Sequence, residues 1–282
     1  MSISIESVKA RPVVKWAGGK RQLLPQLLAS QPSSWTHYWE PFVGGGALFF
    51  ALAPAHAVIS DINAEIVTLY RVIRDAVEDL IRDLTHHRND ADYFYQLRAQ
   101  DPSTLSPVEQ ASRTVFLNKT CFNGLFRVNR QGQFNVPFGR YAHPNIVNAP
   151  GLRAAHHVLQ TTEIVHADYL TMVDHMEPGA FVYCDSPYEP RSTTAHFTAY
   201  TATGFGWADQ VRLAAAVHTL AARGVSVLVS HADSSAIRML YRGLWAQTVK
   251  ARRAINANGA KRGGATELII STYPILGATR LR

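Results

Sequence analysis

Short apolar runs alternate with longer amphipathic stretches along most of this chain. Several runs are almost continuously apolar, which is typical of strands buried on both faces of a parallel sheet. The predicted strands are residues 38–39, 57–60, 163–166, 180–184, 225–230, 246–250 and 267–272. Strands that alternate with helices predict an α/β fold with a mainly parallel sheet.

Two stretches carry the clearest helical signal. Apolar residues between positions 61 and 84 recur every three or four residues and predict one helix over this range. A second helix is predicted over residues 208–223, with Gly224 as its C-terminal stop.

Residues 65–159 interrupt the alternation, because helical signals dominate there and strand signals are few. Within this region, residues 126–129 and 133–136 flank a short turn that contains Gly132, which predicts a β-hairpin. We interpret the region as an insertion into the α/β domain. Its basic, aromatic hairpin is a candidate module for reading a substrate.

Composition narrows the classes of protein that fit. The chain has 282 residues, with 28 Lys and Arg against 21 Asp and Glu, so its formal net charge is +7. This excess suits a nucleic-acid partner as well as a basic enzyme that binds no polyanion. Two cysteines exclude a disulfide framework and a cysteine-rich zinc site. No apolar run reaches the about 18–20 residues that cross a bilayer, and no signal-peptide pattern begins the chain, so we expect a cytoplasmic protein.

Two glycine-rich clusters are candidate ligand-binding loops. The first, residues 14–20, is explained by itself as a turn before a helix. The second, residues 39–46, lies between a predicted strand and a helical run, where a parallel sheet opens space for a ligand. Asp61 ends the next strand and either caps a helix or binds a ribose diol. Together these features favour a nucleoside cofactor, but they do not specify a nicotinamide.

The run Tyr183-Cys184-Asp185-Ser186-Pro187-Tyr188 includes the end of an apolar strand. The exocyclic amine of a nucleobase is a poor nucleophile, because its lone pair is delocalised into the ring. The Asp185 carboxylate and the Ser186 carbonyl could accept its two N–H bonds, and Tyr188 offers a face for an extruded base. An ordinary turn after a strand is the alternative for these residues alone.

Basic, amide and aromatic side chains are mixed over residues 118–127 and 138–141. Arg pairs with guanine edges, Asn pairs with adenine edges and an aromatic ring can wedge between base pairs, which favours nucleic-acid contact over a solvated loop. A later basic run either contacts phosphates or an extruded base, or is a solvated loop; it comprises Lys250, Arg252, Arg253, Lys261 and Arg262. The histidines show no metal-ligand spacing, and the pairs His86-His87 and His156-His157 are interpreted as surface residues.

Taken in this order, the clusters resemble the Dam-type N6-adenine DNA methyltransferases over nearly the whole chain, from Lys15 to about Tyr273. The matching runs are residues 15–20, 40–46, 61–63, 122–127 and 134–141, the tetrad Asp185-Ser186-Pro187-Tyr188, the run Phe197-Thr198-Ala199-Tyr200, and Arg252-Arg253. The resemblance implies a Rossmann-like methyltransferase with a mainly parallel sheet. Residues 1–64 and 160–282 would form the catalytic domain, and residues 65–159 the inserted helical and hairpin target-recognition domain.

The resemblance also implies the cofactor, the partner and the site residues. S-adenosylmethionine would be the methyl donor and double-stranded DNA the partner, with no metal required, and we expect a monomer. The cofactor pocket resembles one formed by Trp16, Ala17, Lys20, Phe42, Gly44 and Asp61, with Asp168 or Tyr169 near the cofactor adenine, and Asp185 also counts among the cofactor-binding residues. Asp185, Ser186, Pro187 and Tyr188 look like the catalytic tetrad. The residues similar to those that read the target duplex, typically GATC, are Lys15, Asn123, Arg127 and Tyr141. Phe122 is similar to an aromatic residue that helps to open the duplex. Arg140 is similar to a residue that contacts a phosphate.

One position departs from the family's usual Asp-Pro-Pro-Tyr tetrad, because Ser186 stands at the first proline. The backbone carbonyl survives this change, whereas the restraint that proline places on φ is lost, so we expect activity to be retained. Phe122 replaces the usual tyrosine and keeps its stacking face. Two alternatives remain open: methylation of another nitrogen, such as cytosine N4 or a protein glutamine, and a DNA-binding homologue that has lost catalysis.

Overall fold

A computed structural model describes residues 8–16, 18–129, 131–188, 204–251 and 265–282 of the chain. Several residues singled out in the sequence lie outside these ranges; they are Ala17, the run Phe197-Thr198-Ala199-Tyr200, Arg252, Arg253, Lys261 and Arg262.

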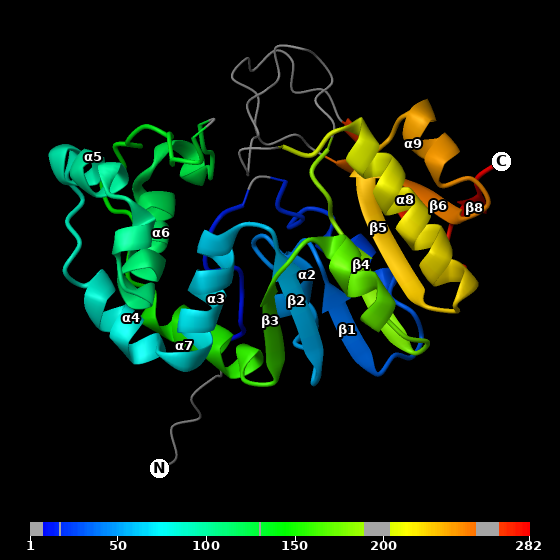
Figure 1. Cartoon of the computed structure of the whole chain (residues 1–282), viewed down its shortest axis with the longest axis horizontal. Coiled ribbons are helices and arrows are strands. Elements are labelled where there is room, and N and C mark those ends of the chain that lie inside the picture. The colour runs from blue at the N-terminus through cyan, green and yellow to red at the C-terminus, as the bar shows by residue number, and fades with distance from the viewer. Residues whose placement is uncertain (1–7, 17, 130, 189–203, 252–264) are drawn as a thin grey trace.

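The centre of the molecule is one mixed sheet (Figure 1). Its strands are β1 (His37–Glu40), β2 (Ala57–Asp61), β3 (Thr162–His166), β4 (Ala180–Cys184), β5 (Ser226–Ala232), β6 (Trp245–Ala251), β7 (Ala265–Ser271) and β8 (Thr279–Arg280), in the spatial order β3-β2-β1-β4-β5-β7-β6-β8. The first five strands in this order pair in parallel, and β7 pairs antiparallel with both β5 and β6. The predicted α/β fold with a mainly parallel sheet is therefore confirmed, and the arrangement is Rossmann-like.

Helices cover both faces of the sheet and extend beyond its β3 edge (Figure 1). They are α1 (Leu24–Ala29), α2 (Ala47–Leu52), α3 (Ala64–Asp75), α4 (Val77–Leu84), α5 (Ala91–Ala99), α6 (Pro107–Thr120), α7 (Ala149–Leu159), α8 (Trp207–Ala222) and α9 (Ser235–Leu240). Short 3-10 turns form at Pro102–Thr104, Phe122–Gly124 and Tyr169–His175. Within the described part of the chain, no helix is both long and apolar enough to cross a membrane.

The predicted helix over residues 61–84 is wrong in two respects. It begins at Ala64, where the Asn63 side chain accepts the backbone N–H groups of Glu65 and Ile66. It also breaks at Ala76, whose φ of −145° separates α3 from α4. The apolar repeat continues through the break because both helices pack into the same core. The second predicted helix is confirmed as α8, and Gly224 follows it with a φ of 78°.

A separate small core holds the hairpin region. Its buried residues come from α5, the end of α6 and the segment after it, and they are Phe94, Phe116, Leu117, Cys121, Phe126, Val128, Phe134 and Val136. A bridge between Val128 and Phe134, with the Asn129 N–H donating to the Gln133 carbonyl, closes the predicted hairpin. By contrast, α3, α4 and α7 share the main core with the sheet. The apolar residues of the hairpin therefore anchor it to the helices and leave its polar residues at the surface.

Candidate active site

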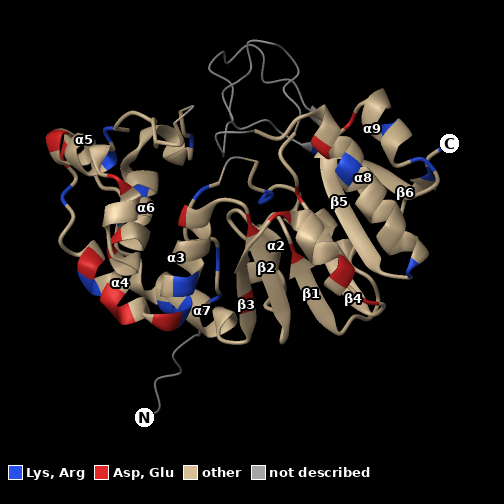
Figure 2. Ribbon diagram, viewed as in Figure 1, with Lys and Arg blue, Asp and Glu red and all other residues tan. Residues whose placement is uncertain are grey.

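Polar side chains converge where the central parallel strands end. Glu40 closes β1, Asp61 closes β2, Asp185 directly follows β4, and Ser230 lies near the end of β5. Acidic segments gather at this edge, between α3 and α8 (Figure 2). In open α/β sheets this carboxyl edge is where ligands bind.

The glycine-rich turn between β1 and α2 is fixed from three sides. Gly44 has a φ of 44°, and its N–H donates to Asp61 Oδ2 at 2.9 Å. The Tyr70 hydroxyl donates to the Gly44 carbonyl at 2.7 Å. A Cβ atom at Gly44 would lie 2.6 Å from the Trp16 ring, so only glycine allows the two segments to approach so closely. The structure thus brings Trp16, Gly44 and Asp61 together.

Asp61 orders this turn from the end of β2. Its Oδ1 accepts the Asn63 N–H at 2.9 Å while Oδ2 holds Gly44. The N-cap of α3 is Asn63, so the alternative that Asp61 caps this helix is wrong. Burial raises the pKa of Asp61, and the backbone N–H groups that it accepts act in the opposite direction.

Glu40 lies beneath the same turn, and sequence reasoning did not single it out. It is buried, and its Oε2 accepts the Tyr38 hydroxyl at 2.6 Å and the Phe49 N–H at 3.1 Å. Burial is the main reason that the pKa of this carboxyl is raised to about 8; the hydrogen bonds from Tyr38 and Phe49 act in the opposite direction, and the nearby Asp185 and Asp61 contribute to the rise.

The remaining predicted cofactor residues lie along the β1, β3 and β4 edge. The ring of Phe42 lies 5.0 Å from that of Tyr169, which is buried and donates its hydroxyl to the Asp209 carbonyl at 3.3 Å. Asp168 accepts the Leu170 N–H at 2.9 Å and caps the turn Tyr169–His175.

Asp185 is held by two groups that meet on one oxygen. Lys20 Nζ lies 2.7 Å from Asp185 Oδ1, and the Ser230 hydroxyl donates to the same oxygen at 3.0 Å. No residue of the described ranges donates a hydrogen bond to Oδ2. Lys20 is only 6% exposed, and Nζ also donates to the Gly18 carbonyl at 2.8 Å. Within the described residues, the protein therefore engages one carboxylate oxygen of Asp185 and not the other.

Ser186 and Pro187 follow Asp185 in an irregular segment, in which Ser186 is buried and Pro187 is partly buried. Ser186 is 2% exposed, and its hydroxyl has no hydrogen-bond partner among the described residues. The Pro187 carbonyl accepts the Gln210 side-chain amide at 2.8 Å, which ties the segment to α8. The structure therefore orients the tetrad's backbone through a residue that the sequence did not indicate.

The Tyr188 ring is held by groups from three segments of the chain. Its hydroxyl donates to Glu267 Oε2 on β7 at 3.0 Å, and its ring centroid lies 4.8 Å from that of His231 on β5. Lys20 Nζ lies 4.7 Å from the Tyr188 ring centroid, within the range of a cation–π contact. Burial lowers the pKa of His231 and so favours its neutral form beside Lys20.

Sequence reasoning missed the supporting residues Gln210, Ser230, His231 and Glu267, and it gave Tyr183 no role of its own. The available signal was positional, because Ser230 and His231 are the polar residues that end an otherwise apolar strand parallel to β4. Gln210 and Glu267 carried no comparable signal, since α8 and β7 reach the site only through tertiary packing.

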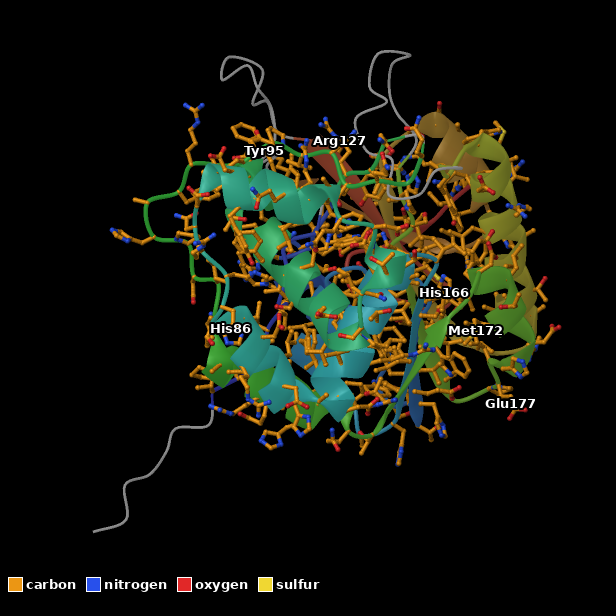
Figure 3. The ribbon with its side chains drawn as sticks, turned by 60° about the vertical axis from the view of Figure 1, so that its left-hand side comes forward. His86, Tyr95, Arg127, His166, Met172 and Glu177 are labelled. Carbon is orange, nitrogen blue, oxygen red and sulfur yellow. The ribbon has the colours of Figure 1, made fainter. Side chains whose placement is uncertain are left out.

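A second group of predicted residues lies on the loops that follow α6, residues 122–141, and we call this surface the loop face. Asn118 bridges this face to the N-terminal segment: its side chain accepts the Lys15 N–H at 2.8 Å and donates to the Lys15 and Gly124 carbonyls. Phe122 is 52% exposed, and Tyr141 is also exposed. Figure 3 shows Arg127 at the upper edge of the molecule, far from His86.

Three residues of this face have constrained conformations. Arg127 Nε donates to Asn135 Oδ1 at 2.7 Å, and its Nη2 donates to the Asn135 carbonyl. Asn123 and Arg140 have left-handed φ values of 58° and 54°, which non-glycine residues adopt at a cost. Such strain is typical of positions whose conformation serves a function.

Positive charge also lines a cavity beside this face. The cavity measures about 680 Å³ and includes Lys9, Arg11 and Lys119, with no acidic group among its described lining residues. Burial and the neighbouring Arg21 and Lys15 lower the pKa of Lys119. An anionic ligand would relieve this repulsion.

One surface interpretation is corrected. The His87 side chain is 6% exposed, and its ring nitrogens lie 2.7 Å from the Tyr93 hydroxyl and 2.9 Å from the Ser112 hydroxyl. It stacks on Phe116 in the core of the helical region, whereas His86 stays exposed. Across the described ranges, no group of three or more His, Cys, Asp or Glu side chains is arranged to hold a metal.

Comparisons with known proteins agree with this geometry. Residues 16–255 match the family model of the D12 class N6 adenine-specific DNA methyltransferases. The chain is 41% identical over 274 residues to the Type II methyltransferase M1.LlaDCHI of Lactococcus lactis subsp. cremoris, which covers 94% of this chain and 96% of the relative. It is 34% identical over 270 residues to the DNA adenine methylase of Escherichia coli K12, with 94% and 96% covered. The chain therefore belongs to the D12 class of N6 adenine-specific DNA methyltransferases.

Proposed function

We propose that this enzyme transfers the methyl group of S-adenosylmethionine to N6 of adenine in duplex DNA, within GATC, after turning the adenine out of the helix. The observation that carries the proposal is the Asp185–Tyr188 tetrad, held at the carboxyl edge of the sheet, where no donor from the described residues reaches Asp185 Oδ2. The single-residue roles below are part of this proposal.

Asp185 and Ser186 would make the adenine amine nucleophilic. Asp185 Oδ2 accepts one N–H bond, and the Ser186 carbonyl accepts the other, since neither is hydrogen-bonded within the described residues. Two acceptors draw the nitrogen towards a tetrahedral geometry and localise its lone pair. Holding this geometry is worth more in a buried site, where water does not compete.

The chemistry of the Asp61 region fits the proposed cofactor. The Asp61 oxygens accept backbone N–H groups, and a carboxylate has about four lone-pair sites, so a ribose hydroxyl could still donate to it. Trp16, Phe42 and Tyr169 supply aromatic surface nearby, while Gly44 keeps the turn free of a side chain. When bound, S-adenosylmethionine supplies a methyl group made electrophilic by its positive sulfur.

Tyr188 would stack on the extruded adenine. Its anchoring by Glu267 and His231 fixes the ring plane before the base arrives, which lowers the entropy cost of stacking. Phe122, exposed on the loop face, is suited to occupy the gap that the adenine leaves.

The loop face would read the duplex. In this proposal, Lys15, Asn123, Arg127 and Tyr141 contact base edges, and Arg140 contacts a phosphate. The strained backbone at Asn123 and Arg140 supports a functional conformation, and the basic cavity supports a polyanionic partner. Residues 65–159 would then act as the target-recognition domain, with Lys15 joined to it through Asn118.

The test is methyl transfer from radiolabelled S-adenosylmethionine to two duplexes that differ only in GATC against its permuted form GTAC, followed by nucleoside mass analysis. We expect N6-methyladenine in the GATC duplex alone. A GATC duplex already methylated on both strands is the matched control. Equal label in both duplexes would show that the enzyme does not require GATC. N4-methylcytosine as the product would show that the methyl group goes to cytosine N4 and not to adenine N6. Tight DNA and cofactor binding without label would indicate a binding protein that has lost catalysis.

A further inference from the structure

We propose that Ser230 and Tyr183 are positioning residues that lock the Asp185 carboxylate in one orientation through a directed chain of hydrogen bonds. The inference rests on the proposed role of Asp185, and it adds two residues of the buried sheet to the machinery around it. Neither residue would touch the adenine or the cofactor.

The direction of the hydrogen-bond chain follows from the number of protons that each group can donate. Ser230 Oγ lies 3.0 Å from Asp185 Oδ1 and 2.9 Å from the Tyr183 hydroxyl. An ionised carboxylate only accepts, so the single Ser230 proton is committed to Asp185. The Tyr183 hydroxyl must then donate to Ser230. The order is Tyr183 to Ser230 to Asp185, and each donor polarises the next.

Strand geometry explains why these three residues meet. β4 and β5 pair in parallel, with Tyr183 opposite Leu228 and Cys184 opposite Val229. Tyr183 lies in β4 and Asp185 is two residues further along, just past the end of the strand, so continued alternation places both side chains on the same side of the sheet. Ser230 is the next residue of β5 in this register, and it lies between the tyrosine hydroxyl and the carboxylate. The register of β4 and β5 therefore fixes the positions of the groups in this hydrogen-bond chain.

Burial makes the chain rigid. Ser230 is 0% and Tyr183 is 1% exposed, so no water competes for these hydroxyls. Lys20 reaches the same Asp185 oxygen from a flexible four-carbon side chain, whereas Ser230 is fixed to a strand. Both contacts fall on Oδ1, which leaves Oδ2 as the oxygen available to the substrate amine. Ser230 thus sets the rotation of the carboxylate, while Lys20 supplies charge.

The experiment measures single-turnover methylation rate and cofactor affinity, by titration calorimetry, for full-length wild type, Ser230→Ala, Ser230→Thr, Tyr183→Phe and the double variant Tyr183→Phe/Ser230→Ala. We expect Ser230→Ala to slow methyl transfer about 10- to 100-fold with little change in cofactor affinity, as for a lost hydrogen bond to a charged group. Threonine keeps the hydroxyl, so Ser230→Thr restores the rate to within about 3-fold of wild type. Ser271→Ala is the matched control, because Ser271 is a buried serine of the same sheet whose hydroxyl donates to the Tyr273 carbonyl rather than to Asp185.

The double variant tests whether Tyr183 acts on Asp185 through Ser230. Tyr183→Phe alone is expected to slow transfer about 3- to 10-fold, and it should add nothing in the Ser230→Ala background, because its effect passes through Ser230. A wild-type rate in Ser230→Ala, or equal Tyr183→Phe effects in both backgrounds, would overturn the inference. If the wild type is active and either of these results is found, the inference fails but the proposed function stands. If the wild type makes no methyladenine, the proposed function itself is refuted. Calorimetry of cofactor binding confirms that each variant is folded.

Discussion

The carboxyl edge of the sheet and the loop face after α6 differ in how far their candidate side chains are buried. At the sheet edge, Asp185 is bonded to two buried groups, and Tyr188 is held by Glu267 and His231. On the loop face, Phe122 and Tyr141 are exposed, and the strain at Asn123 and Arg140 is held in the backbone. One region is therefore held rigid by buried contacts, and the other presents exposed side chains.

This difference follows from what each region would do. Chemical groups must be oriented before the substrate arrives, because reorganisation during the reaction raises the barrier. Groups that read DNA meet a large, hydrated partner and can complete their contacts on binding. The comparison predicts that substitutions at the sheet edge change rate or stability, whereas those on the loop face change affinity and sequence preference.

The largest effect is expected for Asp185→Asn. This variant keeps the size of the side chain but loses its charge, its ion pair with Lys20 and an acceptor for the amine. We expect methyl transfer to fall by about 10²–10³-fold or more, with cofactor binding retained. Single-turnover rate and titration calorimetry measure the two quantities. Transfer near the wild-type rate would show that the tetrad is wrongly assigned.

Burial at the sheet edge also predicts a pH dependence of stability. Glu40 is expected to bind its proton up to a pH of about 8 in the folded state but only to about 4.5 when unfolded. The folded state holds more protons across this window, so this group's stabilisation is complete below pH 4.5 and is lost by pH 8, at roughly 1.4 kcal/mol per pH unit at most.

Glu40→Gln should remove this slope. Chemical denaturation of both proteins from pH 5 to 9 gives the free energy of unfolding, and the difference between the two curves should change across the window and level off above it. Parallel curves would mean that the carboxyl is not protonated in the folded protein.

On the loop face, Arg127→Ala should lower specificity at one base pair by about 1–3 kcal/mol, because Arg127 is oriented by Asn135 for a directional contact. Competition binding against each single-base variant of GATC measures this. Arg140→Ala is the contrast: it should weaken all duplexes alike and lower the salt dependence of binding by about one ion. Uniform weakening by Arg127→Ala would instead make that residue a phosphate contact.

The smallest effect is expected for Ser186→Pro. The change removes a buried hydroxyl without a described partner and restricts the unfolded chain. We expect the protein to gain about 0.4–1 kcal/mol of stability and to keep its methylation rate. Thermal unfolding and single-turnover kinetics check the two expectations. A slower, destabilised variant would show that Ser186 adopts a backbone conformation that proline cannot.

The sequence alone determined the fold class and the positions of the candidate loops. Buried strands require continuous apolar runs, and the glycines and carboxylates that follow such strands mark the carboxyl edge. The hairpin was also predictable, because its turn and flanking residues are local. The end of α3 at Asp75, inside the predicted 61–84 helix, could not be predicted, because the apolar repeat continues unchanged past Ala76.

The tertiary structure decided how the site is held. Apolar runs report that a strand is buried but not its direction, so only the structure shows β7 antiparallel between β5 and β6. That arrangement brings Glu267 to Tyr188, and the β4–β5 register brings Ser230 to Asp185. These contacts join residues separated by 79 and 45 positions. Local sequence encodes which groups end each strand, whereas the register of neighbouring strands, set by packing over the whole sheet, decides which of those groups meet.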